Sequence, residues 1–231
     1  MRILVTGSNG YKGSVLLPKL WGKHEVITLD IGWFGGGADI EADIRAAEIY
    51  GSFDAVIHLA GIANDPCGEL DAKLTWEVNV LGTMRLAQWA ASAGVKQFIF
   101  ASSASVYGVS DEAEITEDMT LEPVSDYNKT KMVAERVLLS YADKMAIQII
   151  RPATVCGWSP RMRLDTMVNM LTYQALSTGT ITAHCGEHGG DLQRPNIHIE
   201  DITDLYVFML ERPQLTGIYN AGFENLSAME T

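Results

Sequence analysis

Short apolar runs alternate with stretches of helical spacing along most of the chain. The apolar runs are rich in Val, Ile, Leu and Phe and show little polar alternation, which is typical of parallel strands buried on both faces. We therefore predict strands over Arg2–Thr6, Glu25–Asp30, Ala55–Ala60, Gln97–Ser102 and Ala146–Arg151.

Three longer segments between these runs carry apolar residues at helical spacing. They predict helices over Ser14–Trp21, Leu74–Ala93 and Tyr127–Tyr141. Strands and helices that alternate in this way indicate an α/β fold. We expect a Rossmann-type doubly wound parallel sheet that is covered by helices on both faces.

The pattern changes after residue 151, where Gly and Pro become more frequent and the elements become shorter. We therefore divide the chain into a first domain, residues 1–152, and a small lobe, residues 153–231, that is interleaved with the sheet. The spacing within this lobe predicts helices over Asp165–Leu176 and Asp201–Leu210, and short strands over Thr180–His184 and Asn196–Ile199.

Composition narrows the choice of partners. The 231 residues suffice for one sizeable core, and 47% of them are hydrophobic, as in ordinary globular proteins. The formal net charge of −12 disfavours nucleic acid and anionic membranes as partners, and no apolar segment is long enough to span a bilayer. The three cysteines, Cys67, Cys156 and Cys185, are widely spaced and odd in number, so we expect reduced thiols and a cytoplasmic protein.

A glycine-rich turn follows the first predicted strand. Gly7, Gly10 and Gly13 are three residues apart, which suits a tight turn, a close approach of the backbone to a pyrophosphate, and tight packing of the next helix. That helix would direct its first amide N–H groups toward the phosphate oxygens. An ordinary strand-to-helix turn is the alternative interpretation. Lys12 inside the turn either adds charge near the pyrophosphate or is a solvated surface lysine.

Asp30 closes the second predicted strand, about twenty residues beyond the turn, where a carboxylate accepts hydrogen bonds from the adenosine ribose of a dinucleotide. The same charge repels a 2′-phosphate, and no arginine follows Asp30 directly, so the pattern favours NAD over NADP. A turn or cap residue is the alternative role for Asp30. Asp43 and Ile44 are candidate contacts for the adenine.

Tyr127 and Lys131 are four residues apart at the start of a predicted helix and therefore lie on one face of it. A phenol has a pKa of about 10, and a nearby ammonium lowers that pKa by favouring the phenolate. Because a strand ending in Ser102 and Ser103 precedes the pair, we expect a hydroxyl and a phenol to meet over the carboxyl ends of the sheet. The alternative is a solvated first helical turn.

Other stretches extend this pattern in order along the chain. They are His58–Gly61, Asn79–Thr83, Ser102–Gly108, Arg151–Val155, Arg194–Ile202 and Tyr219–Gly222. With the glycine turn and the Tyr127/Lys131 pair, they make the chain resemble the extended short-chain dehydrogenase/reductase family. Within that family it is similar to nucleotide-sugar epimerases of the UDP-glucose 4-epimerase type, and the resemblance covers nearly the whole chain.

The resemblance implies an enzyme that uses NAD to oxidise a nucleotide-activated sugar transiently to a 4-keto form and then reduces it again. Tyr127 would exchange the hydroxyl proton, Lys131 would hold the nicotinamide ribose and tune Tyr127, and Ser103 would bond the reacting oxygen. Residues 1–152 would bind NAD and residues 153–231 the substrate. The expected NAD-binding residues are Gly7, Asn9, Gly10, Tyr11, Gly13, Asp30, Asp43, Ile44, Leu59, Ala60, Gly61, Asn79, Ser102, Tyr127, Lys131, Pro152 and Val155.

Two further residues are implied as substrate contacts besides Ser103. Arg194 would contact the diphosphate of the sugar nucleotide, and Asn169 is a second candidate beside it. A surface ion pair is the alternative role for Arg194.

Two related activities and one other class of function stay open. The dehydratases of this family carry an acidic residue where this sequence has Ala104 and Ser105, so the small residues favour an epimerase. A 4-ketosugar reductase is the nearest enzymatic alternative. A non-catalytic NAD-binding or redox-sensing protein would need the glycine turn but has no use for Ser103, Tyr127 and Lys131 together, so their presence favours an enzyme.

A metal site is the alternative interpretation of one short segment. His184, Cys185 and His188 are residue types that ligate zinc, but their compact spacing before two glycines favours a hairpin turn. We therefore expect no metal.

The end of the sequence predicts the start of a helix, because Ser227 and Glu230 have the spacing of a capping box. Family members continue through more of the substrate lobe, so we expect a shortened member with a complete cofactor site and an incomplete substrate site. Apolar surface on Val207, Phe208 or Leu210 would then be covered by a second subunit, in a homodimer.

Overall fold

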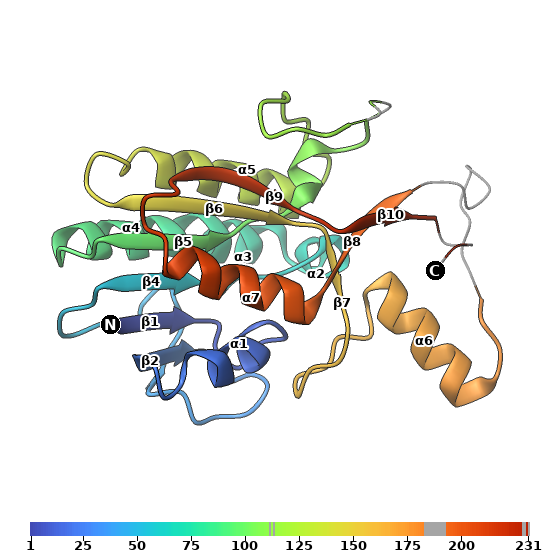
Figure 1. Cartoon of the computed structure of the whole chain (residues 1–231), viewed down its shortest axis with the longest axis horizontal. Coiled ribbons are helices and arrows are strands. Elements are labelled where there is room, and N and C mark those ends of the chain that lie inside the picture. Colours follow the sequence, from blue (N-terminus) through green and yellow to red (C-terminus); the bar gives the residue numbers. More distant parts are fainter. Residues whose placement is uncertain (111, 113, 183–192, 228–229, 231) are drawn as a thin grey trace.

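Seven parallel strands form the central sheet of the computed structural model, which describes residues 1–110, 112, 114–182, 193–227 and 230. The strand order is β3-β2-β1-β4-β5-β6-β9, and every neighbouring pair is parallel (Figure 1). This order runs outward in both directions from β1, which confirms the predicted doubly wound sheet. The strands are β1 Arg2–Thr6, β2 Glu25–Asp30, β3 Ile40–Glu41, β4 Ala55–His58, β5 Gln97–Ala101, β6 Ala146–Pro152 and β9 Gly217–Ala221.

Helices cover both faces of the sheet (Figure 1). On one face, α1 (Gly13–Leu20) packs beside α7 (Ile199–Leu210), and the other face carries α3 (Ala72–Trp76), α4 (Thr83–Ser92) and α5 (Asp126–Leu139). The side chains of β1 show why both layers are needed.

Ile3 and Val5 join the core beneath α1 and α7, whereas Leu4 between them joins the core beneath α4 and α5. All three side chains are fully buried. Each Å² of apolar surface removed from water contributes about 25 cal/mol to the free energy of folding. Burial of these side chains therefore stabilises the packing of both helix layers on the sheet. The expectation of strands buried on both faces is therefore confirmed.

The residues after Pro152 are divided between the central sheet and a second, smaller one. α7 and β9 belong to the layers of the central sheet. The smaller sheet has the order β10-β8-β7, and α6 (Met167–Thr178) lies apart from the central sheet and contacts β7 (Figure 1). The domain boundary at residue 152 stays a prediction. The strands of the smaller sheet are β7 Thr154–Cys156, β8 Arg194–His198 and β10 Glu224–Leu226.

The helix predicted over Leu74–Ala93 is divided into three segments. α3 leads directly into a π-helix, η1 (Glu77–Gly82), which leads into α4. Two further short helices, α2 (Asp65–Leu70) and the 3-10 helix η2 (Ala104–Tyr107), were not predicted. All of these segments follow the strands whose ends form the edge described below.

One expectation about the later part of the chain was wrong, and a second holds only in part. Residues 180–182 do not form a strand, and residues 183–184 of that predicted strand lie outside the described residues. Leu210 is buried in the core between α7 and α1 and is not open to a second subunit, whereas Phe208 is 42% exposed.

The remaining expectations rest partly on residues outside the described part. The Glu230 carboxylate accepts a hydrogen bond from the Ser227 amide at 2.9 Å, as in a capping box, but residues 228–229 and 231 of the predicted helix are not described. Within the described part of the chain, no helix is long and apolar enough to cross a membrane.

Candidate active site

The carboxyl ends of β1, β2, β4, β5 and β6 open into one cleft of about 1720 Å³. Ligands of parallel α/β sheets bind at this edge, because the loops after neighbouring strands meet there. A pocket for one small ligand measures roughly 300–1000 Å³, so this cleft has room for two molecules side by side. We call the side formed by the strand ends the strand-end wall. The opposite side, residues 161–166, 193–195 and 222–225, is the outer wall.

The glycine turn after β1 keeps a backbone cradle open. Gly7 has a φ of +71°, and a Cβ there would lie 2.6 Å from the Ala60 amide nitrogen. A Cβ on Gly13 would lie 2.4 Å from the carbonyl oxygens of Gly7 and Ser8, so the start of α1 packs directly on the turn. Gly10 borders the cleft, and its Cβ would meet only the Gly7 oxygen, at 3.2 Å. Backbone that approaches this closely without side chains fits the pyrophosphate of a dinucleotide.

Asp30 at the end of β2 links this turn to the next loop. Its carboxylate accepts hydrogen bonds from the backbone amides of Asn9, at 3.0 Å, and Gly32, at 2.9 Å. The Asn9 side chain donates to the Gly35 carbonyl at 2.7 Å. Asp30 is buried and still borders the cleft, so its carboxylate both fixes the turn and faces the ligand space.

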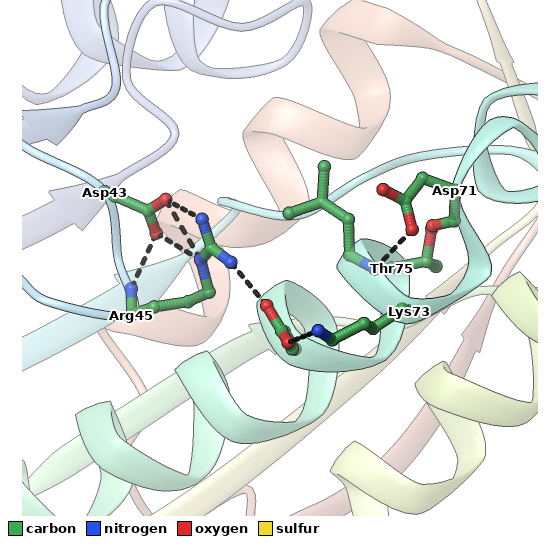
Figure 2. A network of polar contacts seen from close by, with 7 residues as sticks. Asp43, Arg45, Asp71, Lys73 and Thr75 are labelled. Carbon is green, nitrogen blue, oxygen red and sulfur yellow. Dashed lines mark hydrogen bonds and ion pairs between the residues drawn. The ribbon is translucent and has the colours of Figure 1, made fainter.

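Asp43 borders the cleft beside Ile44, and its carboxylate is held by an arginine (Figure 2). Arg45 donates to both carboxylate oxygens of Asp43, through Nε to Oδ1 at 3.1 Å and through Nη2 to Oδ2 at 2.6 Å, and its Nη1 lies 2.5 Å from the Glu77 carboxylate on η1. The guanidinium holds the pKa of Asp43 below its usual range. Arg45 is thus shared between two carboxylates, which offsets its charge.

A chain of buried hydrogen bonds crosses the sheet beneath the cleft. Thr6 Oγ1 lies 2.6 Å from His58 Nδ1, and His58 Nε2 lies 2.9 Å from Thr83 Oγ1. The Thr83 hydroxyl donates to the Asn79 carbonyl at 2.7 Å, so it accepts from His58, and Nε2 carries the proton. Burial lowers the pKa of His58 to about 3, which keeps the ring neutral.

The π-helix directs a second side chain to the loop after β4. The Asn79 side chain accepts from the Ile62 amide at 2.8 Å and donates to the Ile62 carbonyl at 3.0 Å and to Thr130 at 3.1 Å. The loop residues Ala60 and Gly61 border the cleft beside this anchor. Asn79 therefore acts on the cleft through the backbone that it holds.

Ser103, Tyr127 and Lys131 border the cleft together at the carboxyl end of β5. Lys131 is buried on α5, donates to the Ala101 carbonyl at 2.9 Å, and has its Nζ 6.0 Å from the centre of the Tyr127 ring. Burial lowers the pKa of Lys131 to about 8. The Ser103 hydroxyl lies 2.8 Å from that of Ser105 at the start of η2.

Opposing effects act on the Tyr127 phenol. Burial raises its pKa above the ordinary value, whereas a hydrogen bond with the Ser103 side chain, the charge of Arg163 and a hydrogen bond with the Asn64 backbone lower it. Asn64 has a φ of +69° and caps α2 through the Cys67 amide. A phenol with a hydroxyl and nearby cations around it has the parts needed for proton exchange with a ligand in the cleft.

A buried ion pair supports this cluster from behind. Arg151 at the end of β6 donates to both oxygens of Glu135 on α5, at 3.0 and 2.7 Å, and both side chains are almost fully buried. The Ser102 hydroxyl donates to Glu135, and Arg151 also donates to the Tyr107 hydroxyl at 2.6 Å. The pair joins β5, α5, β6 and η2, so it fixes the elements that carry the three cleft residues.

The outer wall carries arginines from the loop after β7. The Arg161 guanidinium lies 3.4 Å from the centre of the Phe34 ring, on the loop after β2, and Arg163 makes a two-pronged pair with Asp165. Arg194 at the start of β8 borders the cleft and is exposed. No carboxylate within the described residues pairs with Arg194, so these residues give no support to the alternative role of Arg194 in a surface ion pair.

The structure brings nearly all the predicted site residues to this cleft, and the exceptions are three asparagines. Asn9 and Asn79 bond to backbone behind the wall, as described above. Asn169 is buried, accepts from the Gly157 amide at 2.9 Å and donates to the Tyr11 hydroxyl at 3.0 Å, so protein groups occupy its amide. In this structure all three position cleft residues rather than face the ligand space.

Two arginines on the outer wall were not predicted as site residues. Arg161 and Arg163 lie outside every recognised motif. The available signal was two basic residues close together in a chain of net charge −12, which has 17 basic residues against 29 acidic ones. That signal alone does not say which way the side chains face.

In the described part of the chain, no group of three or more His, Cys, Asp or Glu residues is placed to hold a metal ion. The candidate segment with His184, Cys185 and His188 lies outside the described residues. The two described cysteines, Cys67 and Cys156, are free thiols.

Known proteins of similar sequence and structure place these observations in one family. The model of the NAD dependent epimerase/dehydratase family matches residues 3–222. A UDP-glucose 4-epimerase of Corynebacterium glutamicum is 33% identical over 237 residues, which cover 91% of this chain and 71% of that protein.

Solved structures agree. The UDP-glucose 4-epimerase of Thermus thermophilus in complex with NAD has a TM-score of 0.85 and 25% identity, covering 100% of this chain and 80% of that one. DesIV, the dTDP-glucose 4,6-dehydratase from Streptomyces venezuelae with NAD and TYD bound, has a TM-score of 0.87 and 27% identity, covering 100% and 78%. On these grounds the chain belongs to the NAD dependent epimerase/dehydratase family.

Proposed function

We propose that this protein catalyses NAD-dependent epimerisation at C4 of a nucleotide-activated sugar, with UDP-glucose as the first substrate to test. The observation that carries the proposal is the placement of Ser103, Tyr127 and Lys131 together in a cleft with room for two ligands, beside an open glycine cradle. UDP-glucose 4-epimerases among the relatives support the substrate class. NAD, when bound, would accept and return a hydride.

Each residue of the cluster has a defined task in this reaction. Tyr127 removes the proton from the C4 hydroxyl as the sugar is oxidised, and returns it when the 4-keto sugar is reduced from the other face. The Ser103 hydroxyl donates to the same oxygen. The charge of Lys131 favours the phenolate of Tyr127, and its position on α5 lets it hold the nicotinamide ribose.

The preference for NAD over NADP is supported by two features of the strand-end wall. Asp30 presents a buried negative charge where the adenosine ribose would lie, and this charge repels a 2′-phosphate. Arg45, a nearby cation on the cleft, is shared between Asp43 and Glu77. Titration of NADH and NADPH by calorimetry tests the proposal, and Asp30→Asn should narrow the difference between their affinities.

An epimerase is favoured over a dehydratase by the residues after Ser103. Ala104 and Ser105 begin η2, and neither is a carboxylate that could remove a further proton from the sugar. A dehydratase neighbour nevertheless shares the fold, and a 4-ketosugar reductase would use the same cluster. A cofactor-binding sensor would need no such cluster.

One labelling experiment separates these activities. The protein is incubated with NAD and UDP-glucose that carries deuterium at C4, and the products are followed by NMR and by the absorbance of NADH. Epimerisation gives an isomer with the label retained at C4 and no net NADH. Dehydration releases water and leaves a 4-keto product, and a sensor binds NAD without turnover. In a parallel incubation with NADH and a 4-keto sugar, a reductase consumes the NADH; any of these three results would contradict the proposal.

The same proposal includes a cytoplasmic homodimer. The free thiols of Cys67 and Cys156 are compatible with a reducing compartment. Leu81 on η1 and Met84 on α4 leave apolar surface exposed on neighbouring turns, which a second copy would cover. Light scattering after gel filtration tests the dimer, and Leu81→Lys should then give monomers.

A further inference from the structure

Lys12 is a cation inside the glycine turn. It occupies the cap position before α1, and it borders the cleft between Gly10 and Gly13, the two glycines nearest to it. The sequence alone is compatible with two roles for Lys12, a charge near the pyrophosphate or a solvated surface lysine. Its position on the cleft excludes the second role, because the side chain is partly buried.

No described carboxylate partners Lys12. Among the described residues its ammonium has neither an ion pair nor a hydrogen bond, and its nearest aromatic contact is the Tyr206 ring on α7, with 5.9 Å between Nζ and the ring centre. Lys19, two turns along the same helix, shows the contrast, because it pairs with Glu200 at 2.7 Å and Asp204 at 2.6 Å. Although the chain is acidic, its described part thus offers this particular lysine no partner.

The charged groups that face Lys12 are cations. Lys131 on α5 and Arg163 on the outer wall both disfavour its charge, and burial disfavours it more, so its pKa falls to about 7. The third neighbour, Tyr206, is fully buried, and its hydroxyl has no partner within the described residues. The positive end of the α1 dipole opposes the ammonium as well. An anion bound in the cleft would offset all of these effects at once.

We propose that the Lys12 ammonium binds the pyrophosphate of the dinucleotide, adding a charged contact to the backbone amides of the glycine turn. The inference rests on the proposed cofactor site. It commits to the dinucleotide rather than to the diphosphate of the sugar nucleotide, because Lys12 belongs to the turn itself.

A pH dependence follows from this assignment. In the free protein Lys12 is half deprotonated at a pH of about 7, whereas a bound diphosphate raises its pKa. Below this pH the lysine is charged in both states. Above it, binding requires proton uptake, so dinucleotide affinity falls as the pH rises from 7 toward the pKa of the complex.

Calorimetry with three ligands tests the proposal. ADP-ribose has the pyrophosphate but no nicotinamide, and it is titrated beside NAD⁺ and NADH into the wild type and Lys12→Met. Loss of a charge-assisted contact should weaken all three by about tenfold or more, and by similar factors. Lys23→Met, which removes an exposed lysine just beyond α1, is the matched control and should change nothing.

Proton uptake gives a second readout. Repeating the ADP-ribose titration in buffers of different ionisation enthalpy should show uptake by the wild type above pH 7 and none by Lys12→Met. Lys12→Arg should keep the affinity but lose the uptake, because arginine stays protonated throughout. Thermal unfolding of each variant checks that the fold is intact.

Each other outcome overturns the proposal in a recognisable way. If a folded Lys12→Met variant binds ADP-ribose as tightly as the wild type, Lys12 does not contact the phosphates. Tighter NAD⁺ with weaker NADH would place the ammonium against the nicotinamide. UDP-glucose is titrated in parallel, and a loss confined to it would assign the ammonium to the substrate diphosphate. If the wild type binds neither ADP-ribose nor NADH, the proposed cofactor site itself fails, together with this inference.

Discussion

The two walls of the cleft are built in different ways. On the strand-end wall, polar groups follow directly from sheet positions and are held by backbone, as Asp30 is by two amides and Lys131 by the Ala101 carbonyl. On the outer wall, Arg161 stacks on an exposed aromatic ring and Arg194 is exposed. The difference teaches that the two walls are held in place by different contacts. Arg161 and Arg194 can therefore change without moving the groups that carry the reaction, whereas the charge of Arg163 acts on the Tyr127 phenol.

The largest expected effect comes from removing the proton-exchanging group of the strand-end wall. Tyr127→Phe should lower turnover of the sugar nucleotide by about a hundredfold or more, the usual scale for a general acid or base. NADH affinity and the unfolding midpoint should stay near wild type, because the ring is kept. Product formation by chromatography measures turnover, and turnover within a few fold of wild type would show that another residue exchanges the proton.

Two substitutions in the glycine turn should separate an effect on stability from an effect on ligand binding within the strand-end wall. Gly7→Ala should cost about 1–3 kcal/mol or more of unfolding free energy, because its φ is positive and the methyl group would meet the loop after β4. Gly10→Ala should cost less, because only one oxygen lies near, yet it should weaken NADH binding by filling the cradle.

Urea unfolding and NADH titration of both glycine variants give the two readouts. Equal stability losses in Gly7→Ala and Gly10→Ala would contradict the roles assigned to these two positions.

For the outer wall we expect a smaller effect, confined to the binding of one of the two ligands. Arg194→Met should weaken binding of UDP-glucose by about tenfold, the scale of one charge-assisted contact to phosphate, and leave NADH binding unchanged. Arg136→Met on the exposed side of α5 is the control. Isothermal titration with each ligand measures the split; equal losses for both ligands would mean that the two walls are not independent.

The last test concerns the hydrogen-bond chain beneath the cleft, and it measures stability rather than binding or turnover. His58 has its pKa lowered to about 3 in the fold, whereas an unfolded histidine titrates at about 6.5. Its contribution to stability is therefore complete above pH 6.5 and is lost as the pH falls toward 3, by up to about 1.4 kcal/mol per pH unit.

Urea unfolding from pH 7 to pH 4 should accordingly show a steeper loss of stability for the wild type than for His58→Asn. Parallel slopes would show that the ring titrates normally in the folded protein.

The same contrast between walls decides how much could be predicted from sequence. Strands β1 and β2 have the predicted bounds, since a continuous apolar run leaves little choice of where a strand begins and ends. The residues that follow each of these strands line the cleft. The outer wall gave no such signal. Arg161 and Arg163 are placed by irregular backbone whose direction depends on contacts far away in sequence, such as the one between Arg161 and Phe34.

The three predicted asparagines are the site residues that do not border the cleft. Asn9 and Asn79 stand in matching motifs and Asn169 does not, but an amide offers both a donor and an acceptor and so suits a backbone anchor as well as a ligand contact. In all three cases the structure shows protein partners. The π-helix that turns Asn79 toward Ile62 has no sequence signal in a pattern otherwise typical of one continuous helix.

Strand β9 has a consequence for how the chain matures on the ribosome. It pairs in parallel with β6, although roughly 65 residues separate the two in the chain. At a synthesis rate of about 5–20 residues per second, the N–H and C=O groups along that side of β6 wait several seconds for their partners. During this interval β6 is an unprotected sheet edge, the kind of surface on which nascent chains associate wrongly. The last strand of the sheet thus also decides when the newly made protein stops being vulnerable to aggregation.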